Sequence, residues 1–122
     1  MDSNHPLPFR DNTFDVVYAR LSLHYFRDSV TKEIFKEIHR ILKPDGILSF
    51  LCKSTGDSFY GKGEEIEKDL FEYEGYMRHF FTENYAKECL GILYTVEKLE
   101  SGEKIPYERD SAYVKCLART VT

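Results

Sequence analysis

Several features that would place this chain in a specialised class of protein are missing. No apolar run approaches the ~18 residues that a membrane-spanning helix needs, and tryptophan is absent. The formal net charge is −4, so no basic field attracts a polyanion over long range. We therefore expect neither a nucleic acid nor a membrane as a partner.

Cysteine is scarce and irregularly placed. The three residues, Cys52, Cys89 and Cys116, form no C-x-x-C pair, and an odd count argues against a disulfide framework. The four histidines are scattered, whereas a structural zinc site needs about four ligands at short spacings. These absences favour a reducing, cytoplasmic location and predict no metal site.

What is present suits a single domain over residues 1–122, because 42% of the residues are hydrophobic. Apolar runs at 14–19 and 47–52 predict strands covered on both faces, as in a parallel sheet. Between them, apolar residues three and four apart predict one stripe of a helix. Asp28 or Ser29 can cap its start, and the turn at 43–46 closes it.

The second half of the chain alternates less regularly. Its patterns predict helices at 64–73 and 82–91, the second capped by Thr82, and strands at 94–99 and 111–120. Strands that alternate with helices imply a parallel α/β sheet, and the last strand pair adds an antiparallel edge. The predicted fold class is therefore α/β with about four strands and flanking helices.

Three segments of the middle region allow more than one interpretation. Residues 56–62 fit G-x-x-x-x-G-K after a strand, but position 63 is glycine, so the hydroxyl that would hold Mg²⁺ in a phosphate-binding loop is absent. The acidic stretch 64–69 suits a metal or a basic partner, although a solvated helix face explains it more simply. The aromatic residues between 73 and 85 can cap a substrate pocket, but a core cluster is the favoured interpretation.

Residues 7–46 contain two motifs in a meaningful order, and a looser resemblance continues through the last 40 residues. Leu-Pro-Phe at 7–9 precedes Phe-Asp-Val-Val at 14–17, and a helix ending in Leu-Lys-Pro-Asp-Gly at 42–46 follows. This combination resembles class I S-adenosylmethionine-dependent methyltransferases. The resemblance implies a partial Rossmann-like sheet in which 14–19 is the fourth strand of the family's seven and 47–52 is the fifth.

The resemblance does not extend to the family's first half. The family holds its cofactor on a glycine-rich loop that lets backbone amides approach the ligand, and no G-x-G-x-G follows a strand here. The acidic residue for the ribose hydroxyls is also missing. The chain therefore resembles a C-terminal half, and we expect a small-molecule methyltransferase that is inactive as this chain alone. The alternative is a non-catalytic, dimeric structural or regulatory half-domain that binds no cofactor.

The resemblance assigns possible roles to a few positions. Asp2 and Ser3 would contact the adenine of S-adenosylmethionine, although a frayed terminus is the simpler interpretation of both. Ala19, Arg20 and Leu21 would pass beside the methionine part of the cofactor, because ligands lie at the carboxyl ends of strands in open α/β sheets. For Arg20 the alternative is an ordinary solvated arginine.

Three further positions would face the substrate. His24 can serve as a general base near neutral pH, although a lone histidine among apolar neighbours is more often structural. Tyr25 follows it directly, and Tyr60 lies in what the resemblance implies is a substrate-side loop.

A half-sheet has one further implication. In the family, the strand equivalent to 14–19 pairs with a strand that has no counterpart in these 122 residues. An apolar edge of this kind recruits another strand. We therefore expect a homo-oligomer that forms through this edge around a two-fold axis, or pairing with a missing N-terminal half.

Overall fold

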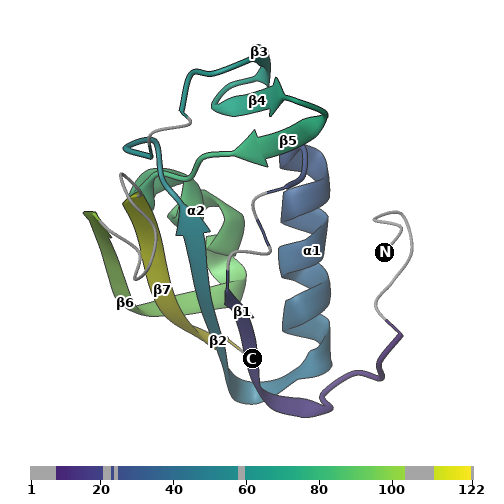
Figure 1. Cartoon of the computed structure of the whole chain (residues 1–122). Helices are drawn as coiled ribbons and strands as arrows, with labels where there is room; N and C mark the ends of the chain where they lie inside the picture. The colour runs from purple at the N-terminus through teal and green to yellow at the C-terminus, as the bar shows by residue number, and fades with distance from the viewer. Residues whose placement is uncertain (1–7, 21–22, 24, 58–59, 104–111, 122) are drawn as a thin grey trace.

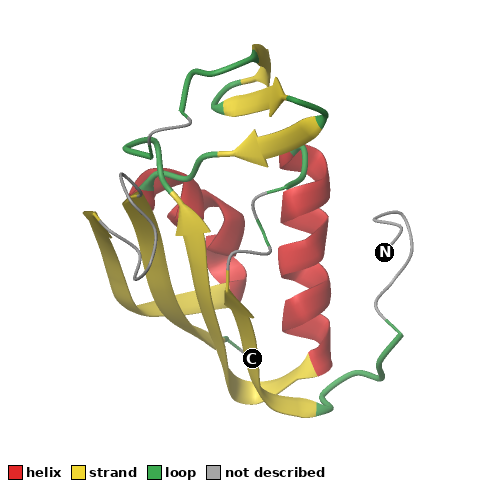
Figure 2. Ribbon diagram, viewed as in Figure 1, coloured by secondary structure: helices red, strands yellow, loops and turns green. Residues whose placement is uncertain are grey.

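The computed structural model describes residues 8–20, 23, 25–57, 60–103 and 112–121. Its main body is a four-stranded sheet with two helices on one face (Figures 1 and 2). The strands, in spatial order, are β1 (Phe14–Arg20), β2 (Leu42–Lys53), β7 (Ala112–Thr120) and β6 (Tyr94–Glu103). β1 and β2 are parallel, whereas β7 is antiparallel to both β2 and β6. The predicted α/β class, with one parallel pair and an antiparallel C-terminal edge, is confirmed.

Helix α1 (Asp28–Ile41) connects the two parallel strands. Its apolar stripe, predicted from spacings of three and four, is buried at Ile34, Phe35 and Ile38. Alternate residues of the strands meet this stripe, among them Leu48 and Phe50 of β2. Phe35 and Phe50 pack edge to face with ring centroids 5.3 Å apart. The core therefore lies between the sheet and α1. The prediction that both faces of the strand at 14–19 are covered is wrong, because Val16 and Tyr18 are exposed.

Helix α2 (Glu83–Leu90) covers the same face of the sheet as α1, and a short 3₁₀ helix, η1 (Gly91–Leu93), leads from it to β6. Thr82 caps α2 as predicted, because its Oγ1 accepts from the Tyr85 amide at 3.0 Å. All three cysteines are buried, as expected of small apolar residues. Burial raises the pKa of Cys89 to about 12 and that of Cys116 to about 11.

The prediction of a helix at 64–73 is wrong. This region forms β3 (Glu64–Glu67) and β4 (Leu70–Tyr73), which pair with β5 (Tyr76–His79) in a separate antiparallel sheet. Two-residue turns break the helical pattern: Asp69 has a φ of 61°, and Glu74 and Gly75 have φ values of 52° and 84°. At Glu74-Gly75 both central residues have positive φ, which is the geometry of a tight hairpin turn. The acidic stretch is therefore a hairpin and not a solvated helix face.

The start of α1 also differs from the prediction. Neither Asp28 nor Ser29 is the N-cap; the capping position is Arg27, which makes no side-chain cap hydrogen bond. The cap comes from the hairpin, because Oε1 of Glu67 accepts from the Asp28 amide at 3.0 Å. An orphan amide of the first turn is thus satisfied by a residue 39 positions away in the sequence.

The sheet ends at β1 on one side. β1 pairs only with β2 in the part of the chain that the structure describes. Val16 and Tyr18 on this strand are 56% and 64% exposed. The predicted apolar edge is therefore present, whereas its partner stays a prediction.

Candidate functional site

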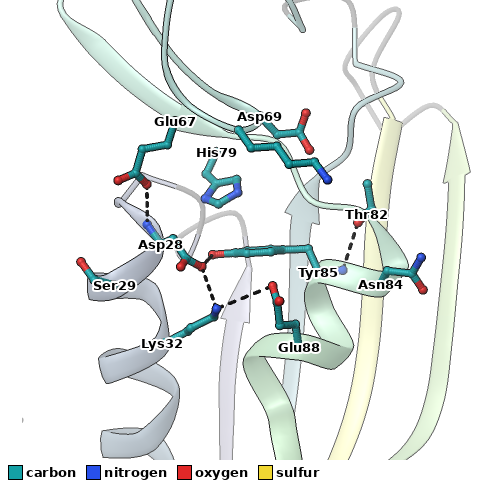
Figure 3. A pocket seen from close by; sticks show the side chains of 11 residues that line it. Asp28, Ser29, Lys32, Glu67, Asp69, His79, Thr82, Asn84, Tyr85 and Glu88 are labelled. Atoms are coloured by element: carbon teal, nitrogen blue, oxygen red, sulfur yellow. Dashed lines mark hydrogen bonds and ion pairs between the residues drawn. The ribbon is translucent and has the colours of Figure 1, made fainter.

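A pocket of about 690 Å³ lies between the small three-stranded sheet of β3–β5, called the hairpin below, and the first turns of α1 and α2 (Figure 3). It is at the same end of the molecule as the carboxyl ends of β1 and β2, because the segment after β5 returns to β2: the Phe81 amide donates to the Lys53 carbonyl at 2.8 Å. Ligands of open α/β sheets bind at this end. The pocket is lined by Asp28, Ser29, Lys32, Glu67, Lys68, Asp69, His79, Thr82, Asn84, Tyr85 and Glu88.

Asp28 organises the floor of the pocket. Its Oδ1 accepts from the Tyr85 hydroxyl at 2.8 Å and lies 3.3 Å from Nζ of Lys32. Lys32 also reaches Oε2 of Glu88 at 3.6 Å, which connects α1 to α2. Burial opposes the ionisation of Asp28, but the bonds from Tyr85 and Lys32 outweigh it and lower its pKa. Asp28 is therefore a carboxylate at neutral pH, and Tyr85 is a donor fixed in its direction.

His79 is the most buried ionisable group that lines the pocket, with 3% of its surface exposed. Its ring lies on that of Tyr85, with centroids 4.2 Å apart, and bonds to the Phe26 backbone. Nδ1 is buried and has no partner among the described residues.

Burial also sets the protonation state of this ring. It lowers the pKa of His79 below the usual 6.5, although the Phe26 bond and the Asp28 charge oppose the change. His79 is therefore a neutral imidazole at physiological pH.

An aromatic cluster supports the roof of the pocket. The Tyr60 ring packs edge to face on Phe71 and Phe80, with centroids 5.2 and 5.5 Å away. The Tyr60 hydroxyl donates to Oδ1 of Asp69 at 2.6 Å, and this bond raises the pKa of Tyr60 to about 12. Phe80 is buried, as the core interpretation of the aromatic segment predicted, but Tyr76 is 64% exposed.

The residues predicted to form the site are only partly placed. Asp2, Ser3, Leu21 and His24 lie outside the described residues, so their roles stay predictions. Ala19 is buried in the core at the end of β1, and Arg20, next to it, is exposed. Tyr25 is 41% exposed and Tyr60 38% exposed. None of the four described residues lines the pocket, and Tyr60 reaches it only through Asp69.

Sequence reasoning missed the residues that the pocket brings together. Asp28 was predicted as a helix cap, Tyr85 as part of an aromatic cluster, and His79 had no assigned role. The one available signal was the pair Glu74-Gly75 between Tyr73 and Tyr76, which is typical of a two-residue hairpin turn. That turn would have placed His79 on a strand facing back toward the sheet.

Comparison with known proteins identifies the architecture. A family model described as a methyltransferase domain matches residues 1–50. A SAM-dependent methyltransferase from Methanosarcina mazei superposes with a TM-score of 0.77 at 19% sequence identity, covering 99% of this chain and 65% of that one. This chain has the class I methyltransferase fold. A methyltransferase from Burkholderia thailandensis, solved with bound S-adenosylhomocysteine, matches it with a TM-score of 0.71 at 20% identity, covering 92% of this chain and 46% of that one.

Curated relatives of this methyltransferase-fold chain carry more than one activity in their names. Human "Arginine-hydroxylase NDUFAF5, mitochondrial" is 51% identical over 69 residues, which are 57% of this chain and 19% of the human protein. Caenorhabditis elegans "Sterol 4-C-methyltransferase strm-1" is 50% identical over 40 residues, which are 33% of this chain and 11% of that protein. The chain thus spans about a fifth or less of these relatives.

The methyltransferase fold implies S-adenosylmethionine, but the described residues do not fit the whole cofactor. They supply only the end of β1, with buried Ala19 and exposed Arg20, and the sequence has no glycine-rich loop. Across the described residues, neither helix is long and apolar enough to cross a membrane, and no group of three potential metal ligands comes together.

Proposed function

We propose that this chain is the substrate-side portion of an S-adenosylmethionine-dependent methyltransferase that acts on a small molecule. The observation that carries the proposal is the pocket at the carboxyl ends of β1 and β2, in a chain whose first 50 residues match a methyltransferase domain. Its volume of about 690 Å³ suits a small molecule and not a folded macromolecule.

The chain's own residues would bind and orient the acceptor. Tyr85, held by Asp28, offers a fixed ring and hydroxyl, and Glu67, Lys68 and Asp69 of the hairpin form one wall of the pocket. Alignment of the acceptor with the methyl group supplies much of the rate of such a reaction, so positioning is the main task of these residues. The cofactor would be held by a glycine-rich half that these 122 residues do not contain, so we expect no activity from them alone.

Calorimetric titration with S-adenosylhomocysteine tests this proposal. We expect no saturable heat from the 122-residue chain up to millimolar ligand. A chimaera that places before residue 1 the part of the Methanosarcina mazei domain that this chain does not match should bind at micromolar levels. If the chimaera folds and binds nothing, the methyltransferase proposal is wrong and the non-catalytic, dimeric half-domain replaces it.

Hydroxylation of an arginine side chain is a second candidate. The human, zebrafish, mouse and rat relatives are all named arginine hydroxylases. Four carboxylates line the pocket, which suits a guanidinium. Mass spectrometry of an arginine-containing peptide, incubated with the chimaera, S-adenosylmethionine, oxygen and a reductant, separates the candidates: hydroxylation adds one oxygen atom, and methylation adds one methylene unit.

We also propose that β1 pairs with a second strand. Its edge carries the exposed Val16 and Tyr18 and has no strand beside it among the described residues. In the isolated chain the available strand is β1 of a second copy, paired antiparallel around a two-fold axis. A complementing half would compete for the same edge, so the chimaera should be monomeric where the isolated chain is dimeric.

A further inference from the structure

The hairpin is a separate unit that packs on the helices. Among the described residues, none of its three strands pairs with a strand of the main sheet. Each of these strands has four residues, and a sheet this small depends on the surfaces that it packs against. It meets the helices where Glu67 accepts from the Asp28 amide and where the His79 ring lies on Tyr85. The hairpin can therefore separate from the helices while the main sheet stays folded.

His79 lies at this contact between the hairpin and the helices (Figure 3). Its ring is buried between Tyr85 and Phe81, and its Nδ1 has no partner among the described residues. An imidazolium carries a hydrogen on both ring nitrogens, whichever nitrogen carries it in the neutral ring. The closed hairpin offers an N–H at Nδ1 neither an acceptor nor water, and burying such a donor is unfavourable. The closed arrangement therefore accommodates the neutral ring better than the charged one.

Titratable groups surround His79 on every element that packs against it. They are Asp28 and Lys32 of α1, Tyr85 and Glu88 of α2, Glu67 of β3, and Lys68 and Asp69 of the turn before β4. Two nearby arginines point to other partners, since Arg78 lies over the Tyr76 ring and Arg27 pairs with Glu67. The carboxylates attract a positive charge on the ring, but burial outweighs this attraction and lowers the pKa of His79.

We propose that the hairpin is an acid-sensitive lid over the pocket: it stays closed while His79 is neutral, and protonation of His79 favours its opening. Opening brings the ring into water, where a histidine titrates near 6.5, so the stability of the closed lid is complete above that pH and is lost as the pH falls. It also removes the wall formed by Glu67, Lys68, Asp69 and His79. The lid controls access to the pocket whatever the pocket binds, and so goes beyond the proposed function.

Hydrogen exchange of the 122-residue chain, measured by nuclear magnetic resonance and corrected for the intrinsic rate at each pH, tests the proposal. The amides of β4 and β5, and the Phe81 amide that donates to the Lys53 carbonyl, report the opening of the lid. The amides of β2 and β7 report the opening of the main sheet. We expect the lid amides to be less protected than the main-sheet amides at every pH. Their protection should fall by up to about tenfold from about pH 7.5 to about pH 5.5, where histidine is the side chain that ordinarily titrates.

Variants assign the pH dependence to one ring. His79→Phe keeps an aromatic ring against Tyr85 and does not titrate, so the protection of its lid amides should change by less than about twofold over the same range. The matched control is His39→Phe, because the His39 ring bonds to the Val121 carbonyl at the far end of α1; it should show the full fall of the parent. If His79→Phe does not fold, His79→Gln takes its place, since glutamine is neutral at every pH.

Three results would overturn the proposal. Lid amides of the parent whose protection does not change with pH would show that opening is not linked to a histidine. A fall that persists in the His79 variant would assign the pH dependence to another group. Equal protection of the lid and main-sheet amides would show that the hairpin opens only when the whole chain unfolds. None of these results depends on the cofactor titration, so the lid and the methyl-transfer function can fail separately.

Discussion

Replacing Gly63 with alanine should destabilise the hairpin more than the same change two residues earlier. Gly63 has a φ of 88°, and a Cβ added there would lie 2.1 Å from the Glu72 carbonyl oxygen. Gly61 has nearly the same φ, 85°, but a Cβ added there meets nothing within 4 Å. The two positions therefore share the backbone strain and differ only in the clash.

The expected magnitudes follow from these two terms. A left-handed conformation costs an alanine ~1–2 kcal/mol, and this term applies to both variants. Forcing an atom into packed surroundings costs a further ~1–3 kcal/mol, and this term applies to Gly63→Ala alone because its neighbour is backbone that cannot rotate away. Gly63→Ala should therefore lose ~2–5 kcal/mol in total, against ~1–2 kcal/mol for Gly61→Ala.

Urea unfolding followed by far-ultraviolet circular dichroism gives the global values. Amide exchange locates the loss, which should be concentrated in β4 where Glu72 lies, because the hairpin forms a sheet of its own. Equal stabilities for the two variants would refute the reasoning, since they would show that the close approach to Glu72 carries no cost. A Gly63→Ala variant with normal exchange in β4 would do the same.

Three further predictions concern the pocket and the sheet edge. The pKa of His79 is lower in the folded chain than in the unfolded chain, so the unfolded chain binds the proton more readily and stability should fall as the pH drops below about 6.5. In His79→Phe, urea midpoints measured across this pH range should lose that part of the acid dependence. An unchanged pH profile would show that the folded chain does not hold the ring neutral. Thr82→Ala removes the acceptor for the Tyr85 amide and should cost ~1 kcal/mol in urea unfolding, with Thr82→Ser near the parent; equal losses in both variants would contradict a capping role. The double change Val16→Lys and Tyr18→Lys should convert a dimer into a monomer in light scattering, because edge lysines prevent strand addition; a dimer that persists would exclude β1 as the interface.

The main sheet could be predicted because local pattern and tertiary burial agree there. The stripe of α1 encodes the side that is buried, and the structure buries that side. The run at 14–19 predicted the strand β1 but not its burial, since Val16 and Tyr18 are exposed. The region 64–73 failed because Ile66, Leu70 and Phe71 fit a helical period as well as a strand pair. The turn at Lys68-Asp69 contains no glycine, asparagine or proline, so these residues do not predict a turn.

The pocket could not be predicted for a related reason. Asp28 and Tyr85 are 57 residues apart, and Asp28 and Glu67 are 39 apart, so no local spacing connects them. They meet only once the hairpin has folded back over the helices. Prediction from the family resemblance pointed instead to positions near the end of β1, of which Ala19 is part of the core.

The cap that Glu67 provides to α1 makes a single amide a spectroscopic reporter. The Asp28 amide is hydrogen-bonded to Glu67 only while the hairpin packs against the start of α1. Its hydrogen-exchange rate therefore measures how often the hairpin detaches from the helix. A ligand that entered by displacing the hairpin would accelerate this exchange before it bound and suppress it afterwards. One resonance would thus follow both the opening of the pocket and its closure, without any label on the ligand.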